Sequence, residues 1–165
     1  LASLLETAAA SDPDPTTGRL RSIIEEGDVE ALVAFVKGEA AAELSARSLS
    51  LAAWALCGHK RFREAASLLE QNIARHPGDL WAHQVLGMAL QSLGRYEDAL
   101  RHFTAVLAIR PKSAVAFNSL GCLLCDGNED YEAAETAFRA CIRIDPDAGL
   151  YRMNLGNALL DAERY

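Results

Sequence analysis

Hydrophobic residues recur along most of the chain at the spacing of amphipathic helices. Between residues 80 and 113 they form two stripes with intervals of three and four residues: Leu86, Leu90 and Leu93, then Leu100, Phe103 and Leu107. Such intervals place each set on one side of a helix. The pattern therefore predicts two helices that pack together along their apolar sides.

Glycine and proline mark the ends of these two predicted helices. Gly94 separates the stripes, and glycine suits the left-handed conformation in which many helices end. Pro111 follows the second stripe, and proline lacks the backbone N–H that a continuing helix needs. Residues 80–113 are thus predicted to form an antiparallel helix pair with a tight turn at Gly94.

The same marks return with a nearly constant period. Pro77, Pro111 and Pro146 stand 34 and 35 residues apart. At fixed distances before each proline come a large apolar residue, an alanine and an aromatic residue: Leu69, Ala65 and Phe62; Phe103, Ala99 and Tyr96; Phe138, Ala134 and Tyr131. A Leu-Gly pair recurs as Leu86-Gly87, Leu120-Gly121 and Leu155-Gly156, with Ala52-Ala53 in the first unit. A fixed period of this length predicts tandem helix pairs.

These residues resemble the tetratricopeptide repeat family over about residues 46–165. The resemblance implies an all-α fold, a right-handed α-solenoid of stacked antiparallel helix pairs, with units at 46–79, 80–113, 114–148 and a partial unit at 149–165. The first unit departs in having Ala53 for the glycine and Leu69 for the aromatic residue. The third unit has one extra residue in the loop 126–130.

The N-terminal part fits the repeat less well. Ala31 and Phe35 precede Ala65 and Leu69 by 34 residues, so residues 28–37 are predicted to be the second helix of a degenerate unit at 19–45. Its first helix, 20–26, is short. Residues 11–18 have linker composition and little expected order, and residues 1–10 are predicted to form a short helix. Because residue 1 is Leu rather than Met, the chain is expected to be part of a longer polypeptide.

The resemblance also implies that the first helices line a concave, partner-binding face. On each first helix, the residues opposite the buried stripe form what we call the outer stripe: Arg47, Ser50, Trp54 and Cys57; Trp81, Gln84, Met88 and Gln91; Val115, Asn118, Cys122 and Cys125; Leu150, Met153, Asn157 and Leu160. It includes one charged residue, both tryptophans and both methionines, a composition typical of contact surfaces.

From the outer stripe we predict a partner-binding set of eleven residues: Arg47, Ser50, Trp54, Trp81, Gln84, Met88, Gln91, Asn118, Cys122, Met153 and Asn157. Trp54, Trp81 and Met88 would anchor the ligand, and the amides would bind its backbone. The alternative is that curvature buries these side chains against neighbouring first helices. Family members that clamp an acidic tail use several cations, whereas only Arg47 and Asn157 approach that pattern here. A neutral or apolar peptide or helix is therefore expected.

Composition narrows the classes of partner and compartment. Sixteen Lys and Arg residues against 23 Asp and Glu give a net charge of −7, which argues against nucleic acid and anionic membrane surfaces. No apolar stretch approaches the roughly 20 residues that span a bilayer. Four cysteines in a chain of this size fit free thiols in a reducing compartment, so a cytoplasmic location is predicted.

No motif in the chain predicts catalysis, a cofactor or a metal site. Cys122 and Cys125 form a C-x-x-C motif, but a zinc site needs four ligands and no second pair accompanies it. Two small apolar residues on a helix is the favoured interpretation. In the acidic loop, Gly127 stands second rather than sixth, unlike a calcium loop. The four histidines lie apart; His83 is expected to pack between helices. The chain is therefore predicted not to be an enzyme.

Two other functions fit the same pattern. An uncovered first helix at 149–165 would expose Leu155 and Leu159 and favour self-association into a homo-oligomer. The repeats could also serve as a substrate-targeting arm of a larger enzyme, such as a glycosyltransferase or kinase, to which related repeats are often joined.

Overall fold

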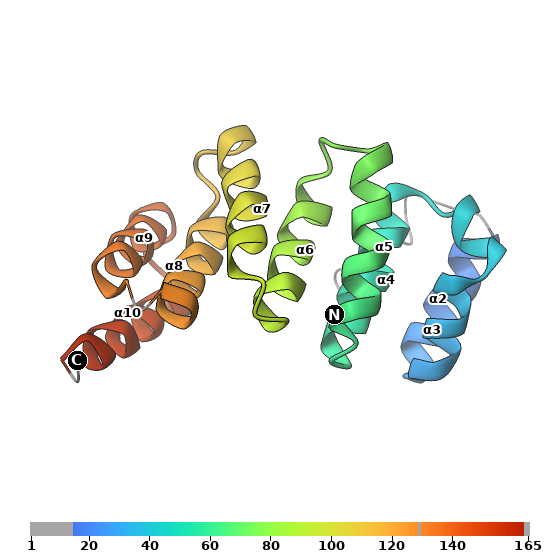
Figure 1. The fold of residues 1–165 in the computed structure, drawn as a ribbon, viewed down its shortest axis with the longest axis horizontal. Helices are drawn as coiled ribbons and strands as arrows, with labels where there is room; N and C mark the ends of the chain where they lie inside the picture. Colours follow the sequence, from blue (N-terminus) through green and yellow to red (C-terminus); the bar gives the residue numbers. More distant parts are fainter. Residues whose placement is uncertain (1–14, 129, 164–165) are drawn as a thin grey trace. The chain divides into compact units, whose positions relative to one another are not determined.

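The computed structural model describes residues 15–128 and 130–163, and these are helical with no strand (Figure 1). The elements are α2 (Pro15–Glu26), α3 (Val29–Lys37), a short 3-10 helix η1 (Glu39–Glu43), α4 (Ala46–Gly58), α5 (Phe62–Arg75), α6 (Leu80–Ser92), α7 (Tyr96–Ile109), α8 (Ala114–Asn128), α9 (Tyr131–Ile144) and α10 (Gly149–Ala162). The predicted helix at 1–10 and residues 11–14 of the predicted linker lie outside the described residues.

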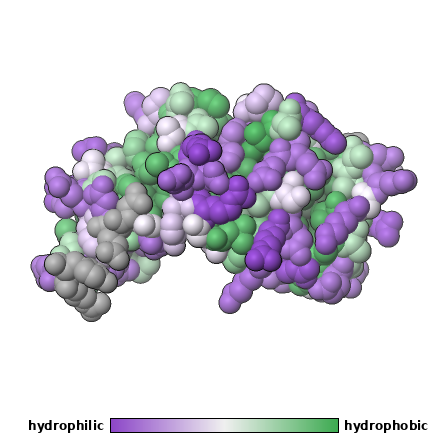
Figure 2. All heavy atoms as spheres, in the orientation of Figure 1, coloured by the Kyte–Doolittle hydropathy of each residue, from purple (hydrophilic) through white to green (hydrophobic). Residues whose placement is uncertain are grey.

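The chain forms two compact units, Leu1–Ala89 and Leu90–Tyr165, whose division falls inside α6. On the face that Figure 2 draws, hydrophilic residues lie beside hydrophobic ones, as expected of amphipathic helices that bury one side. No helix of the described residues combines the length and apolarity needed to cross a membrane.

In the first unit, α2 corrects the predicted linker. It begins at Pro15, so residues 15–18 are helical, and it is 12 residues long. Thr17 and Leu20 lie on one side of this helix and are buried, and Thr17 Oγ1 lies 3.3 Å from the Ser48 hydroxyl of α4. Proline is favoured in the first turn of a helix, where its missing N–H costs nothing. Residues 15–18 of the predicted linker are therefore the start of a helix.

The structure has a helix, α3 (Val29–Lys37), where one was predicted at 28–37. α3 begins after Asp28, whose carboxylate accepts the Ala31 N–H at 2.9 Å, a capping interaction that satisfies an otherwise unpaired donor. Arg61 joins α3 to α5, because its guanidinium lies 2.7 Å from both Glu30 Oε1 and Glu64 Oε1. This double ion pair links the turn before α5 to α3.

A buried asparagine connects the ends of three helices in the first unit. Asn72 of α5 is 1 % exposed, and its Nδ2 donates at 3.2 Å to the Ala46 carbonyl, the Ser50 hydroxyl and Asp79 Oδ2. The other Asp79 oxygen accepts the Trp81 and Ala82 N–H groups, each at 3.0 Å. Asp79 therefore caps α6 and is held by α5 at the same time.

The second unit repeats the helix-pair pattern. Gly94 has the predicted left-handed backbone, with φ of 74°, and α7 ends at Ile109, before Pro111. Ala134, Phe138 and Ala158 form a buried cluster between α8, α9 and α10. The residue of α9 that matches Asn72, Cys141, donates to the Ala114 carbonyl at 3.2 Å. The same position of the second helix thus donates a hydrogen bond to the start of the first helix in both units. The donor is an amide in the first unit and a thiol in the second.

The extra residue of the third repeat lengthens α8 and its closing turn. The Arg61 and Arg95 N–H groups bond to the carbonyls five residues earlier, whereas the Asp130 N–H bonds to Leu124, six residues earlier. Gly127 lies in the added turn against the ring of Tyr96: a β-carbon there would be 2.7 Å from Cγ. The predicted acidic loop is therefore mostly helix, and its glycine is needed for close packing.

Candidate functional site: the outer stripe of the first helices

In the first unit, the outer stripe is partly exposed. Arg47 is exposed, Trp54 and Trp81 are half-buried, and Met88 is 41 % exposed. These four residues come from α4 and α6, and we call them the unit-1 row. Their helices are fixed at their starts by Ser45, which caps α4, and by Asp79, which caps α6.

Two members of the predicted partner-binding set are not at the surface, which corrects the sequence interpretation. Ser50 is fully buried and donates its hydroxyl to Asp79 Oδ2 at 3.2 Å. Gln84 is 8 % exposed. Ser50 lies in α4 and Gln84 in α6. Because both side chains are buried, we leave them out of the proposed surface.

In the second unit, the outer stripe of α8 and α10 is largely exposed and mostly apolar. Seven of its residues form what we call the unit-2 row: Val115, Asn118, Cys122, Leu150, Met153, Asn157 and Leu160. The four apolar residues among them are more than half exposed, from 53 % for Leu150 to 58 % for Leu160. Scattered exposed residues need no explanation, but four on two adjacent helices form a patch of the kind that contacts other molecules.

Asn154 aligns the two helices of the unit-2 row, and the sequence analysis missed it. Its Nδ2 donates to Asn118 Oδ1 at 2.8 Å and lies 3.9 Å from Cys122 Sγ. Asn154 follows Met153 directly and therefore lies at the edge of the outer stripe. From this edge its side chain reaches the previous first helix, α8. The Asn118 amide retains its N–H donors for other partners.

An acidic end to the unit-2 row also escaped the sequence analysis. Asp126 accepts a 2.7 Å hydrogen bond from Gln91 Nε2, and both Asp126 and Asp161 raise the pKa of the Cys125 thiol through their negative charge. Continuing the helical spacing by one turn, from Cys122 to Asp126 and from Asn157 to Asp161, would have found both. The unit-2 row therefore ends in two carboxylates, at the C-terminal ends of α8 and α10.

The thiols of the chain are held in the protonated form. Burial raises the pKa of Cys57 and Cys141 to about 11, and burial followed by the Cys122 and aspartate charges does the same for Cys125. Because the thiolate is the reactive species, these cysteines are poor nucleophiles at neutral pH. All four are free, and the described residues contain no cluster of three or more metal-ligating side chains.

The four histidines lie apart in the structure, and one of them, His83, is buried. His83 is 9 % exposed and its Nε2 lies 3.0 Å from the Pro77 carbonyl, so it holds the turn before α6. His59 and His76 are exposed, and His102 is half-buried. None lies in a cluster with cysteine or acidic residues that could ligate a metal within the described chain.

Comparisons with known proteins agree with the architecture. Two family models described as tetratricopeptide repeat match residues 56–120 and 126–165, together more than half of the chain. MamA (41-end) from Desulfovibrio magneticus RS-1 is 24 % identical, with a TM-score of 0.73 over 92 % of this chain and 88 % of that one.

Two further solved structures share the fold. A tetratricopeptide repeat protein from Parabacteroides merdae is 18 % identical, with a TM-score of 0.73 over 91 % of this chain and 60 % of that one. The Sgt2 TPR domain from Aspergillus fumigatus is 20 % identical, with a TM-score of 0.65 over 73 % of this chain and 82 % of that one. The expected all-α solenoid of antiparallel helix pairs is confirmed, and the chain belongs to the tetratricopeptide repeat family.

Proposed function

We propose that the chain is a protein-interaction scaffold that binds a neutral or apolar peptide or helix of a partner protein along its outer stripe. Membership of a repeat family that binds proteins supports the general role. The exposed apolar patch of the unit-2 row carries the specific proposal, since Val115, Leu150, Met153 and Leu160 are each more than half exposed. Burial of such side chains stabilises a complex by roughly 1.5–3 kcal/mol each.

The polar members of the unit-2 row set the chemistry of the ligand. Asn118 and Asn157 offer amide groups to a bound backbone, and Arg47 of the unit-1 row is exposed. At the C-terminal ends of α8 and α10, Asp126 and Asp161 favour a basic or neutral residue in the ligand and disfavour an acidic one. An apolar segment without carboxylates fits the unit-2 row.

Selection of peptides from a random library by the immobilised protein tests the proposal. Met153→Glu or Leu160→Glu should weaken the binding of a class of selected apolar peptides at least tenfold because a charge would be desolvated, and the peptides of this class should be free of acidic clusters. Ile109→Glu is the matched control, because Ile109 is 57 % exposed, like Met153, but lies outside the outer stripe. Equal effects of all three variants, or acidic clusters in the peptides whose binding Met153→Glu weakens, would contradict the proposal.

Self-association is a second candidate, and one observation favours it. A β-carbon built at Gly156 of α10 has no atom within 4 Å, whereas one at the matching Gly121 would contact Phe138. Leu159, on the next turn, is 40 % exposed. A second copy of the chain could cover this side of α10. Light scattering between low and high micromolar concentration tests this: a concentration-dependent mass supports it, and a constant monomer mass rejects it.

A cytoplasmic location fits the four free thiols, since disulfides are rare in reducing compartments. Localisation of the tagged protein by fluorescence microscopy checks it.

A further inference from the structure

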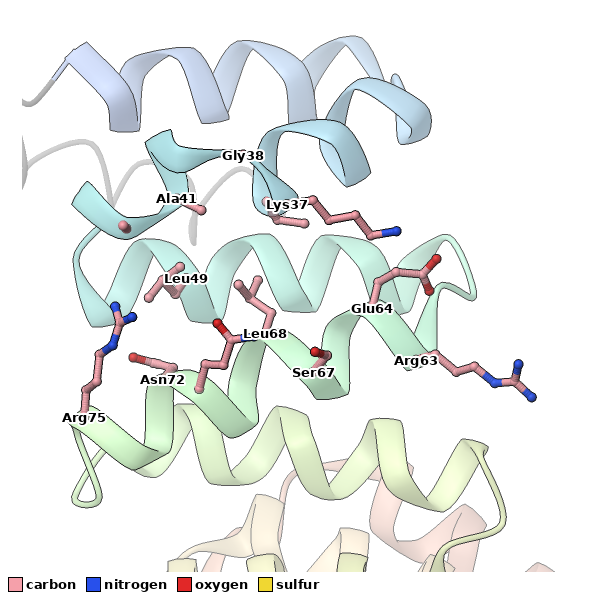
Figure 3. Close-up of a pocket in the computed structure, with 13 residues that line it drawn as sticks. Lys37, Gly38, Ala41, Leu49, Arg63, Glu64, Ser67, Leu68, Asn72 and Arg75 are labelled. Atoms are coloured by element: carbon pink, nitrogen blue, oxygen red, sulfur yellow. The ribbon is translucent and has the colours of Figure 1, made fainter.

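The first unit contains a pocket on a different side of α4 from the outer stripe. It lies between α3 and η1 on one side and α4 and α5 on the other, with a volume of about 560 Å³ (Figure 3). Leu49 of α4 lines it. Trp54, of the unit-1 row, is five positions later and therefore about 140° away around the helix. A ligand in this pocket and a ligand on the unit-1 row would occupy separate faces.

Positive charges mark both ends of this pocket. Lys37 and Arg63 lie at the end where α5 begins, and Arg75 lies at the other end (Figure 3). Arg63 and Arg75 form no ion pair with any other described residue. Arg63 and Arg75 are 12 positions apart on α5, which corresponds to roughly 18 Å along the helix axis.

The acidic residue of the pocket is already paired. Glu64 lies 2.7 Å from Arg61 Nη2, and this hydrogen bond, with smaller contributions from its own backbone and the charge of Lys37, lowers its pKa. The pocket therefore carries a net positive charge in a chain whose overall charge is −7. Such a reversal of sign attracts anionic groups to this site.

Between the charged ends the lining mixes apolar side chains with the polar Ser67, Gln71 and Asn72. Leu49 and Leu68 lie in the middle of the pocket (Figure 3). Asn72 also lines it, and its Oδ1 is buried and accepts no hydrogen bond from the described residues. A buried acceptor without a partner is costly, and an N–H group of a ligand would satisfy it.

We propose that this pocket binds an extended acidic peptide of a partner protein, with carboxylates at both ends and apolar residues between them. In an extended chain, alternate side chains share one face and each residue advances roughly 3.3 Å. Carboxylates six residues apart then span about 20 Å, close to the separation of Arg63 and Arg75. The two intervening residues on the same face would contact Leu49 and Leu68. This proposal is independent of the ligand proposed for the outer stripe.

A dye-labelled, acetylated and amidated peptide, Glu-Ser-Leu-Ser-Leu-Ser-Glu, tests the proposal by fluorescence anisotropy with the whole chain. The pocket should bind it saturably, and replacement of both glutamates by glutamine should abolish binding. Arg63→Gln and Arg75→Gln should each weaken binding about fivefold, and the double variant about 25-fold, because the two sites are far apart and independent.

Arg110→Gln and Met153→Glu are the controls. Arg110 is an exposed arginine outside the pocket, so its loss should leave the affinity unchanged, and Met153→Glu changes only the outer stripe. Absence of saturable binding, equal binding of the glutamine peptide, or equal weakening by Arg110→Gln would each overturn the proposal. Because Met153→Glu affects only the other surface, failure here is distinguishable from failure of the scaffold function.

Discussion

Gly121 lies directly against the ring of Phe138, such that a β-carbon at position 121 would be 2.6 Å from Cε1. Phe138 is 2 % exposed and belongs to the buried cluster of the second unit. The ring therefore has no space into which to move. This contact explains why a small residue on the first helix and an aromatic residue on the second recur together along the chain.

Gly121→Ala should destabilise the second unit, and Gly156→Ala should not. The first change forces an overlap that costs about 1–3 kcal/mol. The second adds a methyl group where no atom lies within 4 Å and removes a helix-weakening glycine, a gain of roughly 0.5–1 kcal/mol. Urea unfolding followed by circular dichroism measures both. Equal free energies of unfolding for the two variants would show that the contact is not tight.

Asn72→Val should lower the free energy of unfolding by about 1–3 kcal/mol. Valine is the replacement because Val106 occupies the matching position in the next repeat. Valine leaves the Ser50 hydroxyl and the Ala46 carbonyl without their shared donor. Asn157→Val is the control, because Asn157 is exposed and its change should lie within about 0.5 kcal/mol. Urea midpoints that shift equally for both variants would contradict the structural role of Asn72.

The stability contributed by Glu64 should disappear in acid. The hydrogen bond from Arg61 lowers the pKa of Glu64 from its ordinary value of 4.5, so this contribution is present above that value and is lost as the pH falls through the lowered pKa. Urea midpoints between pH 7 and pH 3 should therefore fall less steeply for Glu64→Gln than for the unaltered protein. Glu26→Gln, at an exposed glutamate, should leave the slope unchanged. Parallel pH profiles for all three proteins would refute the pairing.

The thiols should react slowly in the folded protein. With a pKa of about 11 for Cys57, Cys125 and Cys141, about one thiol in a thousand is ionised at pH 8. Ellman's reagent should therefore label the native chain far more slowly than the chain unfolded in guanidinium, where four thiols react at once. A rapid burst from the native protein would indicate an activated cysteine and reopen a redox role for Cys122 and Cys125.

Local patterns in the sequence were enough to predict the helix pairs. Gly94 and Pro111 marked turns and ends correctly because glycine conformation and proline chemistry act within a few residues. The start of α2 was missed for a related reason: Pro15 is compatible with both a linker and a helix start. Only burial of Thr17 and Leu20 against other helices decided between them.

The sequence by itself determined the repeats, their period and the matching of small with large residues, since these follow from contacts that recur in every unit. The tertiary structure decided which outer-stripe residues reach the surface. Ser50 is bonded to Asp79 and Asn72, which lie 29 and 22 positions away in the chain, and Gln91 reaches Asp126 35 positions away. A helical pattern assigns a side chain to one side of its own helix, but neighbouring helices determine whether that side is open.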